Sequence, residues 1–473
     1  MTHVNVYIAQ GDVNHNWRED DAPPPAGLLP EAGPAGVFGA VIGYDGSGAP
    51  LPDIGPYDFS SATRVSGVPA MGSSEGAVRM SLAPLADAPQ YVVKACASAG
   101  HAAQAWLASR LFGAVGLATP TAMLVKGCSQ AFDNTLAPER VHLATTFLSG
   151  YRDLGEWIEG DDAWRVFEGA GHRAPAALRH VRDEALAAGV RMAQVLREAG
   201  GLPFHALHGA SARAYADALG YRNAMRLQLC HALPDVYQCA LERHYIAGLW
   251  LGNWDMSNVF MENIGVWRDK NDLPCAMSLD FDACLHLGFQ GRLKENAYDV
   301  ALKQREAVPS LPALTSTFRR DAAAFDATLP EDALADLSQF PYGEHYAPFV
   351  RRFAGFAREA STKTIVDELR NPTSVRAVAA EMAYRLGRIS ALQIRPWAEA
   401  AYRVGQAGGG MASDAEMRHL DPETLVNHLL RRRDSLVQLL GGPWAAQTWA
   451  HMYSTRAEAV DAQQAPFLSR DTT

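Results

Sequence analysis

The sequence predicts an α+β fold in which a small β-rich amino-terminal part precedes a larger helical part. Short apolar runs separated by glycine-containing turns occupy residues 63–148, and such runs are typical of strands. From residue 164 onward apolar side chains recur mainly at helical spacing, as in LRHVRDEALAAGVRMAQVLREAGG, which is typical of helices that bury one face. With 473 residues, the chain is long enough for two or three domains or lobes.

Composition disfavours several classes of protein. Hydrophobic residues make up 48% of the chain and charged residues 20%, as is usual for a globular protein. The formal net charge of −10 disfavours binding to nucleic acid or to an anionic membrane. Six cysteines are scattered without a CxxC pair, which argues against a zinc site or a disulfide framework and favours a reducing compartment.

The amino-terminal segment carries no recognisable targeting signal. No basic region followed by an apolar one opens the chain, so no Sec signal is predicted, and no run approaches the ~20 apolar residues of a membrane span. We therefore expect a cytoplasmic protein, or one secreted into a host cell by a Sec-independent route, as bacterial effectors are. Residues 1–60 are rich in Pro, Gly and Ala and predict a partly disordered leader, with one strand at 4–9.

A glycine-rich loop and a lysine follow the leader. The runs TRVSGVPAMGSSEGAVRMSLAPL and QYVVKACA predict two strands joined by a loop, then a strand that ends in Lys94. Small residues such as Gly72, Ser73 and Ser74 let backbone N–H groups approach phosphate oxygens, and Lys94 adds a positive charge. A simple hairpin turn is the alternative interpretation. The spacing differs from GxxxxGK[ST], which disfavours a Walker-type NTPase.

The rest of the chain is divided where the predicted secondary structure changes. A helix from HAAQAWLASRLFGAVG and two strands, TPTAMLVKG and the run at 141–147, complete an amino lobe over residues 61–150. A mainly helical carboxy lobe is predicted over residues 151–400. A helical extension and a loose tail are predicted over residues 401–473.

The stretch 246–287 contains polar side chains at the ends of two strand-like segments. A turn carries Asn253, Asp255 and Asn258, a short strand VFM follows, and a second apolar strand ends in Asp280. Convergent Asp and Asn oxygens suit a hard divalent cation such as Mg²⁺ and, with it, a polyphosphate. The alternative is two polar clusters at strand ends that carry no chemistry.

Taken in order, these segments resemble HipA-type kinases and the phosphoinositide-kinase-like group of the protein-kinase-like fold. The resemblance rests on VSGVPAMGSSEGAVRMSL, YVVKAC, HAAQAWLASRLFGAVGLATPTAMLV, LGNWDMSNVF and SLDFD. It implies a bilobal fold with ATP and Mg²⁺ bound between the lobes. Lys94 would contact the ATP phosphates, and the segment 144–148, with Thr146 and Phe147, would meet the adenine.

The same resemblance implies the catalytic and metal-binding roles. Asp280 would bind Mg²⁺, Asn258 would hold a second metal ion, and Asp255 would accept or orient the proton of the attacking hydroxyl. Asp255 and Asn258 are three positions apart, whereas related kinases use five. A shortened loop is the favoured explanation, because LGNWD resembles the LGxxD run that leads from a strand into the loop of phosphoinositide-kinase-like enzymes; a displaced Asp255 with weak or unusual activity is the alternative.

The sequence leaves two questions open: how Lys94 is held, and what Asp282 does. The predicted helix offers Gln104 or His101 where such kinases use a Glu to hold the lysine, so either Lys94 is held otherwise or the nucleotide site is altered. Asp282 is either a second metal ligand or a cap for the following turn.

The predicted function is ATP- and Mg²⁺-dependent phosphoryl transfer to a protein Ser/Thr hydroxyl. A phosphoinositide kinase is the alternative with a different acceptor. A pseudokinase or binding scaffold, and a kinase-fold enzyme that transfers AMP or glutamate, are alternatives of other classes. The expected partner is a protein substrate or a phosphoinositide, and the sequence does not determine the oligomeric state.

Overall fold

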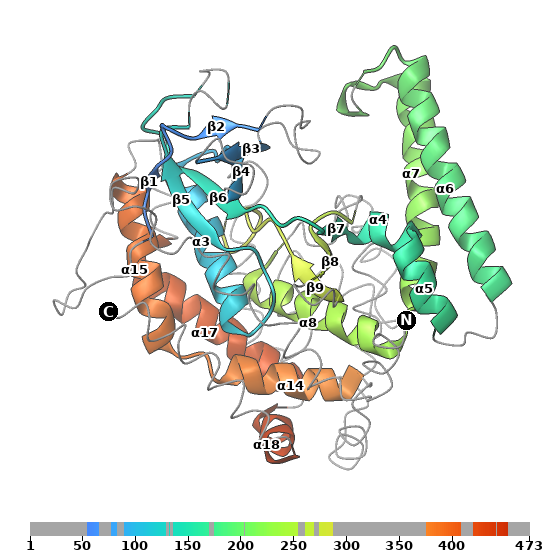
Figure 1. Ribbon diagram of the computed structural model, residues 1–473. Helices are drawn as coiled ribbons and strands as arrows, with labels where there is room; N and C mark the ends of the chain where they lie inside the picture. Colours follow the sequence, from blue (N-terminus) through green and yellow to red (C-terminus); the bar gives the residue numbers. More distant parts are fainter. Residues whose placement is uncertain are drawn as a thin grey trace.

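The computed structural model describes residues 54–65, 77–82, 89–128, 132, 136–169, 175–202, 204–253, 261–268, 274–286, 375–407, 420–440 and 442–452. The predicted α+β fold, with a β-rich amino lobe and a helical carboxy lobe, is confirmed (Figure 1). The strand predicted at 4–9 lies outside the described residues. Among the helices that are described, none combines the length and the apolar character that a membrane crossing requires.

The amino lobe is built on a six-stranded sheet with the order β1-β5-β6-β4-β3-β2. Only β1 pairs in parallel with its neighbour β5, and the other pairs are antiparallel. The sheet begins within the predicted leader, where Phe59 is fully buried. The strands are β1 (Tyr57–Asp58), β2 (Thr63–Arg64), β3 (Ala77–Ser81), β4 (Gln90–Lys94), β5 (Ala122–Lys126) and β6 (His142–Thr146).

Alternation along β4 assigns its side chains to two faces of the sheet. Tyr91 and Val93 are buried in a small core with Phe59 on one face. Val92 and Lys94 therefore point to the opposite face. On that side lies helix α3 (Ala99–Ala114), whose Ser98 cap accepts a hydrogen bond from the backbone N–H of His101 over 3.0 Å.

A second sheet lies between the lobes, in the order β7-β8-β9. Its strands are β7 (Arg152–Asp153), β8 (Ile264–Arg268) and β9 (Pro274–Ser278), all antiparallel. Gly265 is required where β8 meets β7, because a Cβ atom there would overlap the carbonyl oxygen of Arg152 and lie 2.7 Å from the hydroxyl of Tyr151. The predicted strand VFM is wrong at Met261, which lies outside any strand; its other two residues are not described.

The carboxy lobe consists mainly of helices. They are α4 (Leu154–Glu159), α5 (Asp161–Gly169), α6 (Pro175–Glu198), α7 (Gly209–His231), α8 (Asp235–Leu251), α14 (Val375–Gly387), α15 (Ala391–Ala407), α17 (Pro422–Leu439) and α18 (Gly442–Met452), with the short 3-10 helix η3 (Phe204–Ala206). The apolar run that precedes Gly252 is the end of α8. The comparison of LGNWD with a strand that leads into a loop is therefore wrong, because this run enters its loop from a helix.

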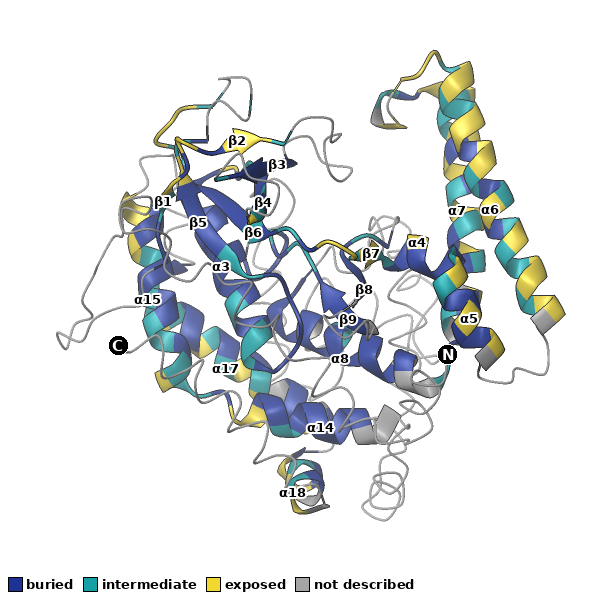
Figure 2. Cartoon of the chain, viewed as in Figure 1, coloured by how far each residue is buried: buried dark blue, intermediate teal, exposed yellow. Residues whose placement is uncertain are grey.

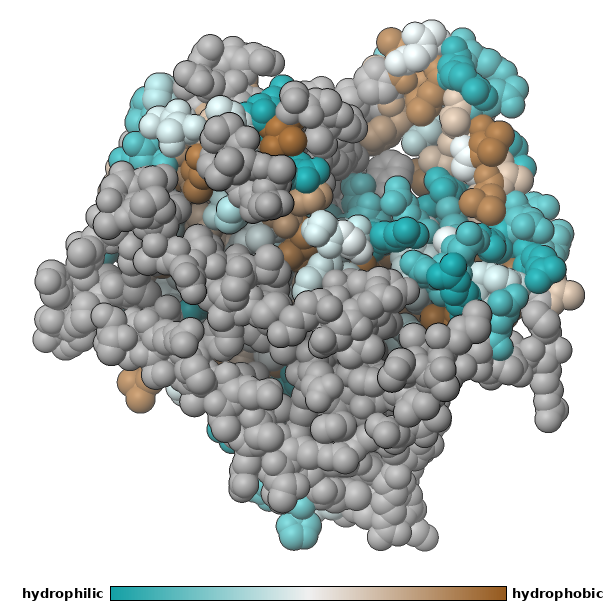
Figure 3. Space-filling model, in the orientation of Figure 1, coloured by the Kyte–Doolittle hydropathy of each residue, from teal (hydrophilic) through white to brown (hydrophobic). Residues whose placement is uncertain are grey.

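Helices α6 and α7 form an arm that projects from the body (Figure 1). Glu159 at the end of α4 anchors the arm, because its carboxylate accepts hydrogen bonds from Arg222 over 2.6 and 2.8 Å and from Arg226 over 2.7 Å. Many residues along both helices of the arm are exposed, whereas α8 and α14 are largely buried (Figure 2). Hydrophobic residues lie among hydrophilic ones on the surface of the arm (Figure 3). The exposed hydrophobic side chains of α6 include Leu186 and Val190.

Buried charges join the helices of the carboxy lobe to the end of α3. Glu381 of α14 is fully buried and lies 2.8 Å from Arg243 of α8 and 2.6 Å from Arg385. Arg385 also donates to the carbonyl oxygens of Val115 and Gly116, over 3.0 and 2.9 Å. The helix that follows Lys94 is thus tied to the main helical core.

Helix α17 completes this core and supports the end of α8. Arg432 donates to the carbonyl oxygen of Trp250 over 2.8 Å, and the indole N–H of Trp250 donates to the carbonyl oxygen of Leu429 over 3.0 Å. The predicted boundary at residue 400 lies inside α15, and apolar residues on both sides of it share the main core.

Candidate active site

Lys94 and two aspartates meet between the lobes. Lys94 Nζ lies 2.5 Å from Asp280 Oδ2 and 2.7 Å from Asp282 Oδ2. The three side chains are 19%, 22% and 16% exposed, respectively, so solvent and a ligand can reach them. The contact between Lys94 and Asp280 joins residues 186 positions apart in the sequence.

The position of Lys94 follows from the strand and from the segment after it. Lys94 is the last residue of β4 and pairs with Ala77 of β3 on one side and Leu143 of β6 on the other. Arg140 fixes the next turn of the chain, because its guanidinium donates to the carbonyl oxygen of Cys96 over 2.5 and 3.0 Å. The lysine therefore extends from the end of an interior strand whose neighbouring backbone is held in place.

The two aspartates flank a buried aromatic residue just after β9. Phe281 is 2% exposed and packs against Phe112 of α3, with 5.1 Å between ring centroids. Because Phe281 points into the core, its neighbours Asp280 and Asp282 both turn toward Lys94. Asp280 has a φ of 55°, a left-handed conformation that Asp adopts more readily than most residues.

Helix α3 contacts the backbone of this turn. The N–H of Ala97 donates to Nδ1 of His101 over 3.3 Å, so Nε2 carries the proton and donates to the carbonyl oxygen of Asp282 over 2.9 Å. Gln104 accepts a hydrogen bond from the backbone N–H of His286 over 3.2 Å. His101 and Gln104 thus hold the aspartate turn, and the two aspartates hold Lys94.

The local charges keep Lys94 protonated and Asp282 ionised. Burial alone would lower the pKa of Lys94, but the charges of the two carboxylates outweigh it and raise that pKa. Burial disfavours the charged form of Asp282, yet the charge of Lys94 holds its pKa below the ordinary value. Burial and the charge of Asp282 raise the pKa of Asp280. With two carboxylates and one ammonium group, the site favours an added cation.

The donor set fits Mg²⁺ in its usual protein environment. Mg²⁺ prefers oxygen ligands and is commonly held by one or two carboxylates together with substrate phosphates. Asp280 and Asp282 supply such carboxylates beside a lysine suited to a phosphate. Within the described ranges, no three His, Cys, Asp or Glu side chains form a cluster able to hold a metal ion.

Strand register turns the side chain of Thr146, which was predicted to meet the adenine, away from Lys94. Thr145 pairs with Val92 and so shares the face of Lys94, whereas Thr146 pairs with Tyr91 on the other face. Thr146 is 5% exposed, and its hydroxyl has no hydrogen-bond partner among the described residues. Within the segment 144–148 that the prediction assigned to the adenine, the side chain of Thr146 therefore points away from the face that carries Lys94.

Phe147 lies beside a residue that the sequence did not single out. The guanidinium of Arg79 on β3 lies 3.6 Å from the ring centroid of Phe147 and also donates to Gln90. The backbone N–H of Phe147 donates to the carbonyl oxygen of Gln90 over 2.8 Å. Strict alternation along β3 could have identified Arg79, because it is the one charged residue of that strand.

The predicted loop residues lie outside the described residues. These are Gly72, Ser73, Ser74, Asp255 and Asn258, and their roles stay predictions.

The start of the predicted catalytic loop is nevertheless close to the aspartate turn. Helix α8 ends at Leu251 and Gly252 has a φ of 63°, as is usual for a residue that terminates a helix. The backbone N–H of Leu285 donates to the carbonyl oxygen of Leu251 over 2.7 Å. Asn253 is fully buried, so the chain enters the loop from a fixed point.

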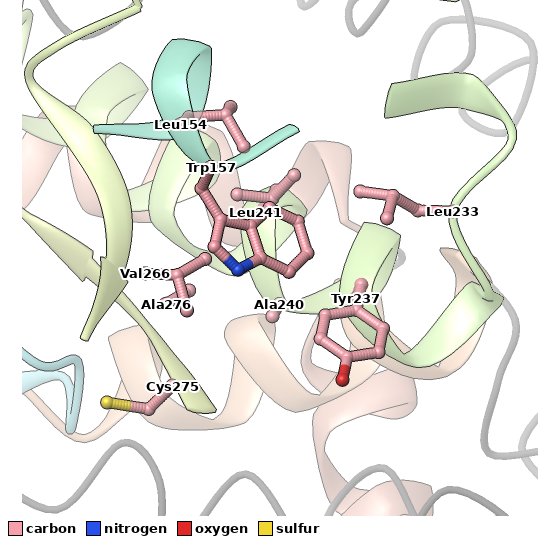
Figure 4. Close-up of a pocket in the computed structure, with 9 residues that line it drawn as sticks. All are labelled: Leu154, Trp157, Leu233, Tyr237, Ala240, Leu241, Val266, Cys275 and Ala276. Carbon is pink, nitrogen blue, oxygen red and sulfur yellow. The ribbon is translucent and has the colours of Figure 1, made fainter. Parts of the chain in front are cut away.

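A separate apolar cavity lies between α4, α8 and the second sheet (Figure 4). Its volume is about 10 Å³, which is near the lower limit for a single water molecule. The lining residues include Trp157 and Tyr237, whose rings stack with centroids 5.8 Å apart. This cavity is too small for a nucleotide and does not contain Lys94 or the aspartates.

Comparison with known proteins finds a kinase among the solved structures, at low similarity. The chain matches no protein-family model and no curated protein sequence. Among solved structures it is similar to the crystal structure of a Helicobacter pylori proinflammatory kinase, CtkA, with a TM-score of 0.36 and 10% sequence identity. The similarity covers 84% of this chain and 98% of that one. Because this similarity is low, the functional argument rests on the site itself.

Proposed function

We propose that the protein is an ATP- and Mg²⁺-dependent phosphotransferase of the protein-kinase-like class. The observation that supports this most is the convergence of Lys94 and Asp280 at 2.5 Å from a strand of the amino lobe and from a turn of the carboxy lobe. A phosphoryl-transfer site needs a cation beside a metal-binding carboxylate between two rigid elements. Both elements here are held by buried side chains.

For phosphoryl transfer the protein has mainly to position the reactants and to stabilise charge. Lys94 would bind phosphate oxygens of the nucleotide, and Asp280 would hold Mg²⁺, whose charge would offset that of the phosphates. Because the transferred group passes through a loose transition state, positioning and electrostatic stabilisation provide most of the catalysis. Asp255 accepts or orients the proton of the acceptor hydroxyl, and Asn258 binds a second metal ion; these two roles rest on the sequence resemblance.

We propose a protein Ser/Thr hydroxyl as the acceptor, with a phosphoinositide hydroxyl as the alternative. The first follows from the HipA-like amino-lobe sequence, and the second from the short spacing between Asp255 and Asn258. The expected site of action is the cytoplasm, either of the producing cell or of a host cell reached by a Sec-independent route.

The test uses the full-length protein with Mg²⁺ and ATP labelled at either the γ- or the α-phosphate. Incorporation is measured into the protein itself, into a generic protein acceptor such as casein, and into phosphoinositide vesicles. Label from the γ-phosphate alone supports the proposal, and the acceptor that receives it decides between protein and lipid. Label from the α-phosphate alone indicates nucleotidyl transfer. The absence of both transfer and Mg²⁺-dependent ATP binding would indicate a scaffold.

Two variants and their matched controls link the activity to this site. Lys94→Met and Asp280→Asn should each abolish transfer, because one removes the phosphate contact and the other a metal ligand. Lys126→Met, at the exposed end of β5, and Asp217→Asn, exposed on α7, change the same residue types elsewhere and should leave transfer unchanged. Full activity of Asp280→Asn would refute the assignment.

A further inference from the structure

We propose that Asp282 is a positioning residue that holds Lys94 in place of a helix carboxylate, and that His101 of α3 fixes the position of Asp282. This inference rests on the proposed function and deepens it. It divides the two aspartates by role: Asp280 is the metal ligand, and Asp282 is the partner that keeps the lysine oriented.

The first argument is the composition of α3. Helix α3 lies on the Lys94 face of the sheet and contains no acidic residue along its whole length, AGHAAQAWLASRLFGA. Neither His101 nor Gln104 is a counter-ion for an ammonium group. A charged partner for Lys94 must therefore come from another element, and Asp282 Oδ2 lies 2.7 Å from its Nζ atom.

The second argument is the way in which the aspartate turn is attached to α3. His101 Nε2 donates to the carbonyl oxygen of Asp282 over 2.9 Å, and the ring of Phe281 packs on Phe112 of the same helix. Both contacts fix the backbone at Asp282. A shift of α3 would consequently be transmitted to Lys94 through Asp282, although the helix itself supplies no carboxylate.

The third argument distinguishes the two aspartates by geometry. Asp280 lies closer to β9, in a left-handed conformation with a φ of 55°, and has the more exposed side chain of the two, at 22% against 16%. Its Oδ1 atom accepts a hydrogen bond of 3.4 Å from the backbone N–H of Asp282. Asp280 can therefore turn an oxygen toward a metal ion while Asp282 retains Lys94.

The decisive experiment measures ATP binding to the full-length protein by titration calorimetry over a range of Mg²⁺ concentrations. At saturating Mg²⁺, Asp282→Asn should weaken ATP binding about 10- to 100-fold, as expected for the loss of a charged hydrogen bond. Lys94→Met should weaken it to a similar extent, and the double variant should show little further loss. The Mg²⁺ midpoint should stay at the wild-type value in Asp282→Asn and rise in Asp280→Asn.

His101 is tested by a pair of substitutions. His101→Leu removes the hydrogen bond to the turn and should weaken ATP binding without moving the Mg²⁺ midpoint. His101→Gln retains an N–H donor and should recover part of the affinity. Equal affinities of the Leu and Gln variants would remove His101 from the proposal. Thermal unfolding without nucleotide checks that each variant is folded.

Other outcomes overturn the positioning role of Asp282. A Mg²⁺ midpoint that rises in Asp282→Asn as it does in Asp280→Asn would make Asp282 a second metal ligand. Unchanged affinity and midpoint would leave it as a cap for the turn. If the wild-type protein shows no Mg²⁺-dependent ATP binding, the proposed function fails and this inference with it. A failure confined to Asp282→Asn leaves the proposed function intact.

Discussion

Replacing Glu381 by Gln should strongly destabilise the protein, because it removes a buried carboxylate that pairs with two arginines. Glu381 and Arg243 are both fully buried, and Arg385 is 7% exposed. The carboxylate of Glu381 lies 2.8 Å from Arg243 and 2.6 Å from Arg385. Gln retains the shape of Glu but removes the charge, and breaking a buried ion pair in this way costs about 3–5 kcal/mol.

The assay is urea unfolding of the full-length protein, followed by tryptophan fluorescence. Glu381→Gln should lower the free energy of unfolding by about 3–5 kcal/mol. Glu423→Gln is the matched control, because Glu423 also pairs with an arginine, Arg395 at 2.7 Å, but both side chains are exposed. Its stability should hardly change. If the two variants unfold at the same urea concentration, the buried charges do not hold α14 to α8 and α3 as we argue.

Three further predictions concern the arm and the support of the site. Glu159→Gln should reduce hydrogen-exchange protection of α6 and α7, and acid should do the same. Burial alone would raise the pKa of Glu159, but the arginines that bind it outweigh burial and lower that pKa. The stabilisation by Glu159 is therefore complete above its ordinary pKa of 4.5 and is lost as the pH falls through the lowered value. Gly265→Ala should lower the free energy of unfolding by about 1–3 kcal/mol through overpacking. Gly387→Ala is the control, because a Cβ there meets nothing, and it should not lower that free energy. Equal melting temperatures of the two variants would contradict this. Phe281→Ala should lower the free energy of unfolding by about 3–5 kcal/mol and weaken ATP binding, because it releases the aspartate turn from Phe112. Unchanged ATP binding would show that this packing does not support the site.

Residues whose roles depend on local pattern could be predicted from the sequence. Lys94 ends a short alternating strand, and the structure has it as the last residue of β4. Asp280 follows an apolar run that forms β9. The apolar run before Gly252 was ambiguous, because a short apolar segment fits a helix or a buried strand equally well. The structure has it as the last turn of α8.

Strand register decides matters that composition leaves open. Thr145 and Thr146 are adjacent and chemically identical, yet a one-residue difference reverses the face of a strand. The pairing of Val92 with Thr145 decides that Thr145 shares the face of Lys94. No property of either threonine alone distinguishes them.

The sequence by itself determined the α+β class and made Lys94 and Asp280 candidates, because these depend on periodicity among neighbouring residues. Only the tertiary structure decided that Asp282 also holds Lys94 and that His101 contacts the aspartate turn. Those contacts join residues more than 180 positions apart, and they form only when the sheet, α3 and β9 pack against one another. The contact of Lys94 with a carboxylate from the turn after β9 is therefore a property of the fold, which local sequence patterns do not encode.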